Sequence, residues 1–389
     1  MNHRERVLAA IRHQPVDRCP TDFWATPEVQ EKLFAHFGMG REAHAGSWTG
    51  KGVIAGQAVS LLGNVLSRGG EGIIELYDAV GIDGIINISP PYIGPALREE
   101  GSYSENEWGM GYRRHGYGEG SYSENATYPL GQAETIADLD AYRWPSPDWY
   151  DYSALPDIAG LFPDRAIACG YVSMTYYAYQ LRGLENSLMD PLARPEFTHH
   201  MLKRMSDFFH EYHTRCFEAA KGTVHVTQVT DDYGSQKGLL ISPRTFNEFY
   251  RKPVQRALDL ARSFDIVTFH HDDGDCRELL PTLVEMGIQI LNPLQWRCGD
   301  WDLVRLKAEF GDRLCFHGGV DNQHTLPFGT KGEVRAEVKR LIESLASDGT
   351  GYIIAPCHNI QPNTSVENIL ELYRAAQEYG RFHCNEALK

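Results

Sequence analysis

The chain has 389 residues, of which 42% are hydrophobic, and its formal net charge is −15 at neutral pH. This acidic balance argues against binding to nucleic acid or to anionic membranes. No apolar run approaches the roughly 20 residues of a membrane span, and the N-terminal residues lack the apolar core of a signal peptide. The eight cysteines are scattered without a CxxC pair, which is typical of reduced thiols. We therefore expect a cytoplasmic protein.

The N-terminal half shows short periodic runs separated by turns. Helices are predicted at residues 4–13, 27–37 and 71–80, and strands at 21–24 and 81–86. The hexapeptide Gly-Ser-Tyr-Ser-Glu-Asn begins at residue 101 and again at residue 120, with aromatic and polar residues alternating between the copies. This pattern favours an antiparallel hairpin, so we expect a flap inserted at about residues 100–126.

The C-terminal half alternates strands and helices regularly. Strands are predicted at 166–173, 224–230, 265–270, 289–293, 314–318 and 352–356, and the segments between them include helical runs at 187–220 and 279–286 and a helix opened by Ser242-Pro243-Arg244. Such alternation implies a parallel sheet. With the two earlier strands the count reaches eight, which favours a single α/β domain over residues 1–389, folded as a closed (β/α)8 TIM barrel.

Polar residues recur at one place in each unit, at or just after the strand. They are Asp231-Asp232, His271 with Asp273, Asn292, His317 with Asp321, and His358-Asn359. Barrel enzymes collect their catalytic groups at this face, so we expect a common pocket there. The structural alternatives are that Asp231 or Asp232 caps the next segment, and that His270, which alternates to the other side from His271, is a packing residue. Cys357 has no evident neighbouring base and is predicted to be structural.

His271, Asp273 and His358 together form a set of two histidines and one carboxylate. Such a set holds divalent transition metals with open positions. The spacing alone equally allows a metal-free, hydrogen-bonded cluster that serves as acid, base or anchor.

Several of these motifs match a known family. They are Arg4-Glu5-Arg6-Val7-Leu8-Ala9-Ala10, Asp17-Arg18-Cys19-Pro20, Gly81-Ile82-Asp83, Tyr179 in Tyr-Gln-Leu-Arg-Gly, Asp231-Asp232-Tyr233-Gly234, Ile241-Ser242-Pro243, Gly318-Gly319-Val320-Asp321 and Pro356-Cys357-His358-Asn359. The chain thereby resembles the uroporphyrinogen decarboxylase superfamily over nearly its whole length. That superfamily includes the haem-pathway decarboxylase and the cobalamin-dependent methyltransferases, such as methylcobamide:coenzyme M methyltransferases. The resemblance implies a (β/α)8 barrel and a homodimer.

Departures from the family pattern favour the methyltransferase branch. The decarboxylase binds its eight-carboxylate substrate with arginines after its first strand, whereas no arginine occurs here between Arg18 and Arg41. Binding so many carboxylates without cations is expensive. The methyltransferases bind zinc with His-x-Cys and a later Cys. Here Asp273 replaces the first Cys and His358 stands at the second, so the metal-binding frame is kept with harder ligands. Zinc is the expected metal, and iron or manganese also suit such ligands.

Two enzymatic hypotheses follow from the resemblance. In the first, a metal at His271, Asp273 and His358 supports methyl transfer between a corrinoid carried by a partner protein and a thiol or a methoxylated small molecule. Asp231, Asp232 and Tyr179 would orient the substrate or carry protons, with His358 also catalytic. The predicted substrate-binding residues are Asp83, Asn292, His317 and Asn359.

The alternative hypothesis is a cofactor-independent decarboxylase acting on a tetrapyrrole or a smaller carboxylic acid. Asp83 would hold its cationic intermediate, as the family's Asp contacts the tetrapyrrole nitrogens, while Tyr179 and His358 manage the proton. A third class, a non-catalytic binding protein that partners a corrinoid carrier, is disfavoured by the polar groups that line one face of the predicted barrel.

Overall fold

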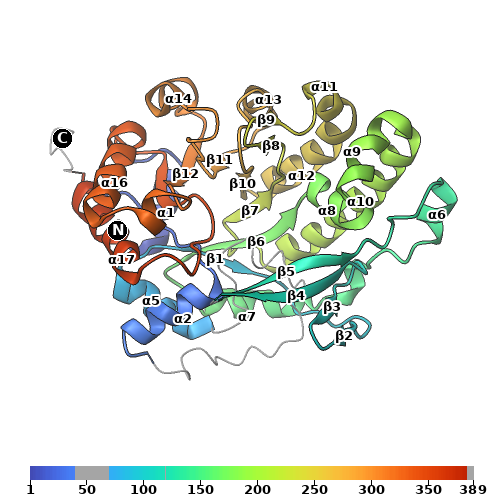
Figure 1. Ribbon diagram of the computed structural model, residues 1–389, viewed down its shortest axis with the longest axis horizontal. Coiled ribbons are helices and arrows are strands. Elements are labelled where there is room, and N and C mark those ends of the chain that lie inside the picture. Colours follow the sequence, from blue (N-terminus) through green and yellow to red (C-terminus); the bar gives the residue numbers. More distant parts are fainter. Residues whose placement is uncertain (40–69, 119, 383–389) are drawn as a thin grey trace.

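The computed structural model of the protein describes residues 1–39, 70–118 and 120–382. At its centre is a curled parallel sheet of seven strands, hydrogen-bonded in the order β1-β6-β7-β10-β11-β12-β13 (Figure 1). The strands are β1 (Ile85–Ile88), β6 (Ala166–Val172), β7 (Val226–Val229), β10 (Val267–His271), β11 (Ile290–Asn292), β12 (Cys315–Val320) and β13 (Tyr352–Pro356). Parallel neighbours in chain order are the product of successive strand–helix units, as the sequence predicted.

Helices connect these strands and surround the curled sheet (Figure 1). In the C-terminal half they are α8 (Met174–Arg182), α9 (Leu184–Ala193), α10 (Pro195–Ala219), α11 (Pro243–Thr245), the π-helical η4 (Phe246–Tyr250), α12 (Arg251–Ser263), α13 (Leu280–Met286), α14 (Leu303–Phe310), α15 (Thr325–Phe328), α16 (Lys331–Leu345) and α17 (Val366–Tyr379). Among the described residues before β6, the helices are α1 (His3–Ile11), α2 (Pro27–His36), α5 (Gly70–Val80), α6 (Ile136–Ala141), η2 (Pro147–Trp149), η3 (Tyr152–Ala154) and α7 (Leu155–Gly160). None of the helices in the described ranges is both long and apolar enough to cross a membrane.

The predicted strand at residues 21–24 is not a regular strand, so the sheet has seven strands and is not closed into the expected eight-stranded barrel. Thr21 makes an isolated parallel bridge to Ile354 of β13. On the β1 side, the backbone N–H of Ile85 donates to the side chain of Asp22 at 3.2 Å instead of to a backbone carbonyl. This exchange interrupts the ladder. The segment therefore lies between β13 and β1 without completing the sheet.

The interior of the curl is filled by alternate strand residues. Val267 and Phe269 of β10 face inward, whereas Thr268 and His270 belong to the other face. The inner cluster contains Trp24, Ile85, Ala166, Ala168, Val226, Val267, Phe269, Ile290, Cys315 and Ile353. Val7, Ala10 and Ile11 of α1 belong to the same cluster, so α1 covers the amino ends of the strands. A larger cluster packs the outer face of the sheet against the surrounding helices.

The region at 100–126 contains the predicted hairpin. It is part of a four-stranded antiparallel sheet, in the order β2-β3-β4-β5, that lies beside the curled sheet (Figure 1). The strands are β2 (Glu99–Glu100), β3 (Tyr103–Glu105), β4 (Gly111–Tyr117) and β5 (Gly120–Thr127). The backbone N–H of Ser121 donates to Glu28 Oε1 at 3.2 Å, which ties the hairpin to the start of α2. A second short hairpin, β8 (Gly234–Ser235) with β9 (Gly238–Leu239), follows β7.

Candidate functional site

The two loops that follow β10 and β13 converge at the carboxyl end of the sheet. His271 ends β10, Asp273 lies two residues beyond it, and His358 follows β13. One ligand atom from each of these three residues lies within 4.8 Å of the others. Nε2 of His271 is 3.7 Å from Asp273 Oδ1, and Nε2 of His358 is 3.8 Å from Asp273 Oδ2. The predicted meeting of these residues is therefore confirmed.

A tight turn at Gly274 holds Asp273 in place. Gly274 has φ +88°, and a Cβ atom there would lie 2.6 Å from the backbone oxygen of Ser235. Only glycine accepts both constraints without strain. The backbone N–H of Asp275 donates to that same Ser235 oxygen at 2.8 Å. The loops after β7 and β10 are thus packed backbone to backbone, which explains the glycine that follows the acidic pair.

Asp232 joins the same site from the end of β7. Its Oδ1 is 3.9 Å from His271 Nε2 and accepts the backbone N–H of Asp273 at 3.0 Å. Burial raises the pKa of Asp232, and the charge of Asp273 adds to this while His271 opposes it. Of the predicted pair, Asp232 is therefore the carboxylate that faces the site.

The two histidines have opposite electrostatic environments. Burial alone would lower the pKa of His271, but the carboxylates of Asp273 and Asp232 raise it above its ordinary value. Burial lowers the pKa of His358, although Asp273 opposes that shift. The side chain of His271 is 8% exposed, whereas those of His358 and Asp273 are 28% and 39% exposed. The site is thus open at His358 and Asp273 and enclosed at His271.

The three residues fit a divalent metal by the state of their ligand atoms. Nε2 of His271 and Oδ1 of Asp273 are buried atoms that make no hydrogen bond to any described residue. Within the described residues, the ion pairs of Asp273 and Asp232 involve histidines and neither lysine nor arginine. Buried lone pairs near carboxylates without a cation are expensive, and a metal ion removes that cost. Imidazole and carboxylate ligands suit zinc, iron and manganese.

Trp24 forms a wall of the site that sequence reasoning missed. Its ring stacks on His271, with centroids 5.6 Å apart and planes at 23°, and it lies edge-on to His358 at 6.5 Å. It also contacts His317, with a centroid distance of 5.8 Å. A signal was present, because Asp22 and Trp24 share one face of an extended segment by their spacing of two. Their inward direction was not evident from that short run.

Asn292 and His317 lie beneath the site instead of lining it, contrary to their prediction as substrate-binding residues. Both side chains are fully buried. Nδ1 of His271 donates to Asn292 Oδ1 at 2.5 Å, and Asn292 Nδ2 donates to His317 Nδ1 at 2.7 Å. His317 in turn donates through Nε2 to Asp22 Oδ2 at 3.0 Å. All their polar side-chain atoms are used within the protein, so they are out of reach of a substrate.

Asp231 caps a helix and does not face the substrate side, which corrects its prediction as a catalytic residue. Its carboxylate accepts hydrogen bonds at the start of α8 from the backbone N–H groups of Met174, Thr175 and Tyr176 at 2.8–3.1 Å and from the hydroxyls of Ser173 and Thr175. Tyr233 donates to it as well, at 3.0 Å. A negative charge at a helix N-terminus is stabilising. The capping alternative expected the segment after Asp231 to be capped, whereas the capped helix α8 precedes Asp231 in the sequence.

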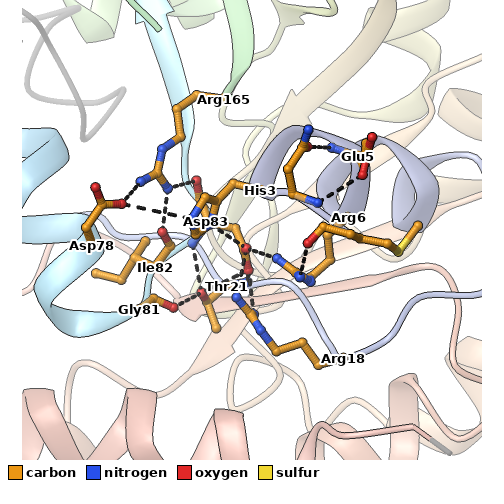
Figure 2. Close-up of polar contacts among 12 residues, drawn as sticks. His3, Glu5, Arg6, Arg18, Thr21, Asp78, Gly81, Ile82, Asp83 and Arg165 are labelled. Carbon is orange, nitrogen blue, oxygen red and sulfur yellow. Dashed lines mark hydrogen bonds and ion pairs between the residues drawn. The ribbon is translucent and has the colours of Figure 1, made fainter. Parts of the chain in front are cut away.

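Asp83 lies at the opposite end of the sheet from His271, Asp273 and His358, which argues against its prediction as a substrate-binding residue. It precedes β1, whereas His271, Asp273 and His358 lie at or just after the carboxyl ends of their strands. Figure 2 shows its carboxylate surrounded by Arg6, Arg18, His3 and Thr21. The two guanidinium groups donate at 2.6 Å each, and His3 Nδ1 lies at 2.9 Å. Burial would raise the pKa of Asp83, but the hydrogen bond from His3 and the charge of Arg18 lower it to about 2. This carboxylate anchors α1.

The remaining candidates lie near the carboxyl end. Tyr179 is on α8, and burial together with the charges of Asp231 and Asp232 raises the pKa of its hydroxyl. Asn359 follows His358, is almost fully buried and accepts a hydrogen bond from Gln361 through its backbone carbonyl. The roles of Tyr179 and Asn359 stay predictions. His270 donates to the carbonyl of Val229 and Cys357 contacts the carbonyl of Leu294, so both pack as predicted.

Comparison with known proteins assigns the family. The model of the uroporphyrinogen decarboxylase (URO-D) family matches residues 167–379. This chain belongs to the URO-D family. The match begins in β6 and ends with α17, so it includes Asp232, His271 and His358 and the strands that precede or contain them. Residues 1–166, which contain Trp24 and Asp83, lie outside it.

Individual relatives of this URO-D family chain carry two different names. Methylcobamide:CoM methyltransferase MtaA of Methanosarcina barkeri is 30% identical over 140 residues, which are 36% of this chain and 38% of the relative. Uroporphyrinogen decarboxylase of Chlorobium phaeobacteroides is 22% identical over 190 residues, 47% of this chain and 50% of the relative. The chain thus spans half or less of the length of these curated relatives. A methyltransferase structure from Methanosarcina mazei has a TM-score of 0.61, 20% identity, and coverage of 97% of this chain and 99% of its own; at this identity the likeness is one of fold.

Proposed function

We propose that this chain is a metal-dependent methyltransferase that transfers a methyl group between a corrinoid protein and a thiol or a methoxylated small molecule. The observation that carries the proposal is the convergence of His271, Asp273 and His358, whose ligand atoms lie within 4.8 Å of one another. The similarity to a methylcobamide:CoM methyltransferase supports the same branch of the family. A corrinoid carrier protein and a homodimer belong to the proposal as expected partners.

The three residues would hold the metal through His271 Nε2, the carboxylate of Asp273 and His358 Nε2. Two neutral imidazoles and one carboxylate leave positions free for a substrate atom, and zinc is the metal we expect. When bound, the metal would supply Lewis acidity to an acceptor thiol or alcohol, or to the oxygen of a methyl ether.

Residues around the metal would accept the proton of the substrate thiol or alcohol and exclude water from the site. Asp232 stands beside His271 on a different strand end, and burial raises the pKa of its carboxyl, which makes it a better proton acceptor for a thiol or alcohol. Tyr179 would orient the substrate through its hydroxyl. Trp24, which is 2% exposed, keeps water away from the inner side of His271 and holds the imidazole plane.

The decarboxylase hypothesis loses the residue on which it depended. It required Asp83 beside Tyr179 and His358, whereas Asp83 is fully buried at the amino end among Arg6, Arg18 and His3. A substrate with many carboxylates would also meet Asp232 and Asp273 at the mouth. Like charges brought together in a partly buried site repel, so that substrate class is disfavoured.

Metal analysis of the purified protein tests the proposal. We expect one divalent metal per chain by elemental analysis, retained on dialysis, and its loss in His271→Ala and in His358→Ala. The matched control is His324→Ala, because His324 is exposed on the loop after β12 and pairs with Asp321 instead of Asp273. The control should keep the metal. A fully folded wild-type protein that takes up no zinc, iron or manganese would contradict the proposal.

A further inference from the structure

A continuous chain of hydrogen bonds runs from the candidate metal site into the buried interior of the sheet. It passes from His271 on β10 to Asn292 on β11, to His317 on β12 and to Asp22 in the segment between β13 and β1. The first two residues are register partners in adjacent parallel strands. The donor–acceptor distances are 2.5, 2.7 and 3.0 Å in that order. Four different segments thus contribute one residue each.

Asp22 fixes the direction of every bond in this chain. A carboxylate has no proton to donate, and Asp22 already accepts from the backbone N–H groups of Phe23 and Ile85 and from Trp24 Nε1. The Nε2 atom of His317 must therefore carry a proton in order to bond to Asp22. In the neutral ring, Nδ1 of His317 is then an acceptor.

The same logic passes through the amide to the site. Because His317 Nδ1 accepts, the NH2 group of Asn292 must face it, and the amide oxygen must face His271. His271 then carries its proton on Nδ1, and its Nε2 keeps a lone pair. That Nε2 atom makes no hydrogen bond to any described residue and faces Asp273 at 3.7 Å.

We propose that Asp22, His317 and Asn292 are positioning residues, which fix the proton of His271 on Nδ1 so that Nε2 is presented as an acceptor lone pair. The identity of the metal at Nε2 rests on the proposed function, but the position of the proton does not. Hydrogen bonds behind a liganding histidine set its tautomer and ring orientation, and their loss typically weakens metal binding by about 10–100-fold. The stacked ring of Trp24 holds the same imidazole from its face.

The amide of Asn292 prevents proton transfer along this series of hydrogen bonds. A side-chain amide is a very weak acid and a very weak base, and Asn292 could relay a proton only through an unfavourable imidic acid form, so the hydrogen-bonded series does not conduct protons from the site to Asp22. Its effect is one of orientation, and the three residues behind His271, which are Asn292, His317 and Asp22, are almost completely buried. We therefore expect changes in the chain to alter metal affinity and tautomer without altering which small molecules enter.

Nitrogen-15 NMR of histidine-labelled protein tests the inference first without metal. Long-range proton–nitrogen correlations show which ring nitrogen carries the proton, and the His271 signals are identified by their absence in His271→Gln. At alkaline pH, where the imidazole is neutral, the wild type should show His271 protonated on Nδ1 alone. In Asn292→Leu and His317→Phe we expect a mixture of both tautomers. A wild-type His271 with its proton on Nε2 overturns the inference, even if neither variant folds.

Zinc affinity, measured by competition with a chelator, gives the second reading. Asn292→Leu and His317→Phe should bind zinc about 10–100-fold more weakly with unchanged stoichiometry at saturation. The matched control is His270→Phe, which alters a buried histidine on the other face of β10, and its affinity should match the wild type. Unchanged affinity in both test variants overturns the positioning role and leaves the proposed function standing. A wild type that binds none of zinc, iron and manganese but shows the predicted tautomer supports the positioning role and contradicts the proposed function.

Discussion

The buried carboxylate at the amino end of the sheet has cationic partners, whereas the carboxylates at the carboxyl end do not pair with lysine or arginine among the described residues. Asp83 is surrounded by Arg6, Arg18 and His3, and its oxygens accept several short hydrogen bonds. Asp232 and Asp273 lie close to each other, and within the described residues their ion pairs are with histidines alone. Charge is thus balanced at one end of the sheet and left in excess at the other.

The difference indicates which end is built for stability and which for chemistry. A buried charge that is paired on every side needs nothing from solution, whereas acidic groups gathered without a cation lose stability through desolvation and repulsion. Proteins keep such unfavourable groups mainly at functional sites. The contrast therefore separates an anchor for α1 from the candidate functional site.

The largest expected effect comes from removing the charge of the anchor. Asp83→Asn leaves two guanidinium groups beside a neutral amide in a buried position, so we expect the free energy of unfolding to fall by about 3–5 kcal/mol. Urea denaturation measures it. The control is Asp312→Asn, because Asp312 is 79% exposed and pairs with the neighbouring Arg313 at 3.4 Å. That change should stay within about 0.5 kcal/mol. Equal effects in the two variants would show that the cluster around Asp83 adds nothing to stability.

A second effect of Asp83 is on the pH dependence of the free energy of unfolding. The folded-state pKa of Asp83 is lowered to about 2, so its contribution is complete above the pKa of an unfolded Asp, near 4, and is lost as the pH falls from there towards 2. The loss should be about 2 kcal/mol. Unfolding free energies of the wild type and Asp83→Asn, measured from pH 6 to pH 2, should converge by about that amount. Parallel curves would contradict the assignment.

The smallest effect is expected at the opposite end, with the opposite sign. Asp273→Asn removes one of two neighbouring carboxylates, so the metal-free protein should be unchanged or stabilised by up to about 1 kcal/mol. Its metal content should nevertheless fall. Thermal denaturation of chelator-treated protein, beside elemental analysis, provides both readings. A loss of stability comparable with that of Asp83→Asn would remove the distinction between the two ends.

Much of this arrangement followed from the sequence for physical reasons. Buried apolar runs flanked by turns located the strands, and because the carboxyl ends of parallel strands share one edge, His271 and His358 were expected to meet. The depth of each side chain below the carboxyl edge of the sheet was harder to predict. Asn292 and His317 have the right alternation for the interior, yet alternation does not say how far below the rim a residue lies. The position of Asp83 could not be predicted, because its partners Arg6 and Arg18 are distant in sequence and because the strand begins after it.

The placement of α1 decides how reactants reach the site. Val7, Ala10 and Ile11 pack with inward-facing strand residues at the amino end of the curled sheet. Helix α1 therefore closes that end. Because the amino end is filled, we expect reactants to approach His271 from the carboxyl end of the sheet. Under the proposed function, a methyl donor and a methyl acceptor would then use the same opening, so we expect them to bind one after the other.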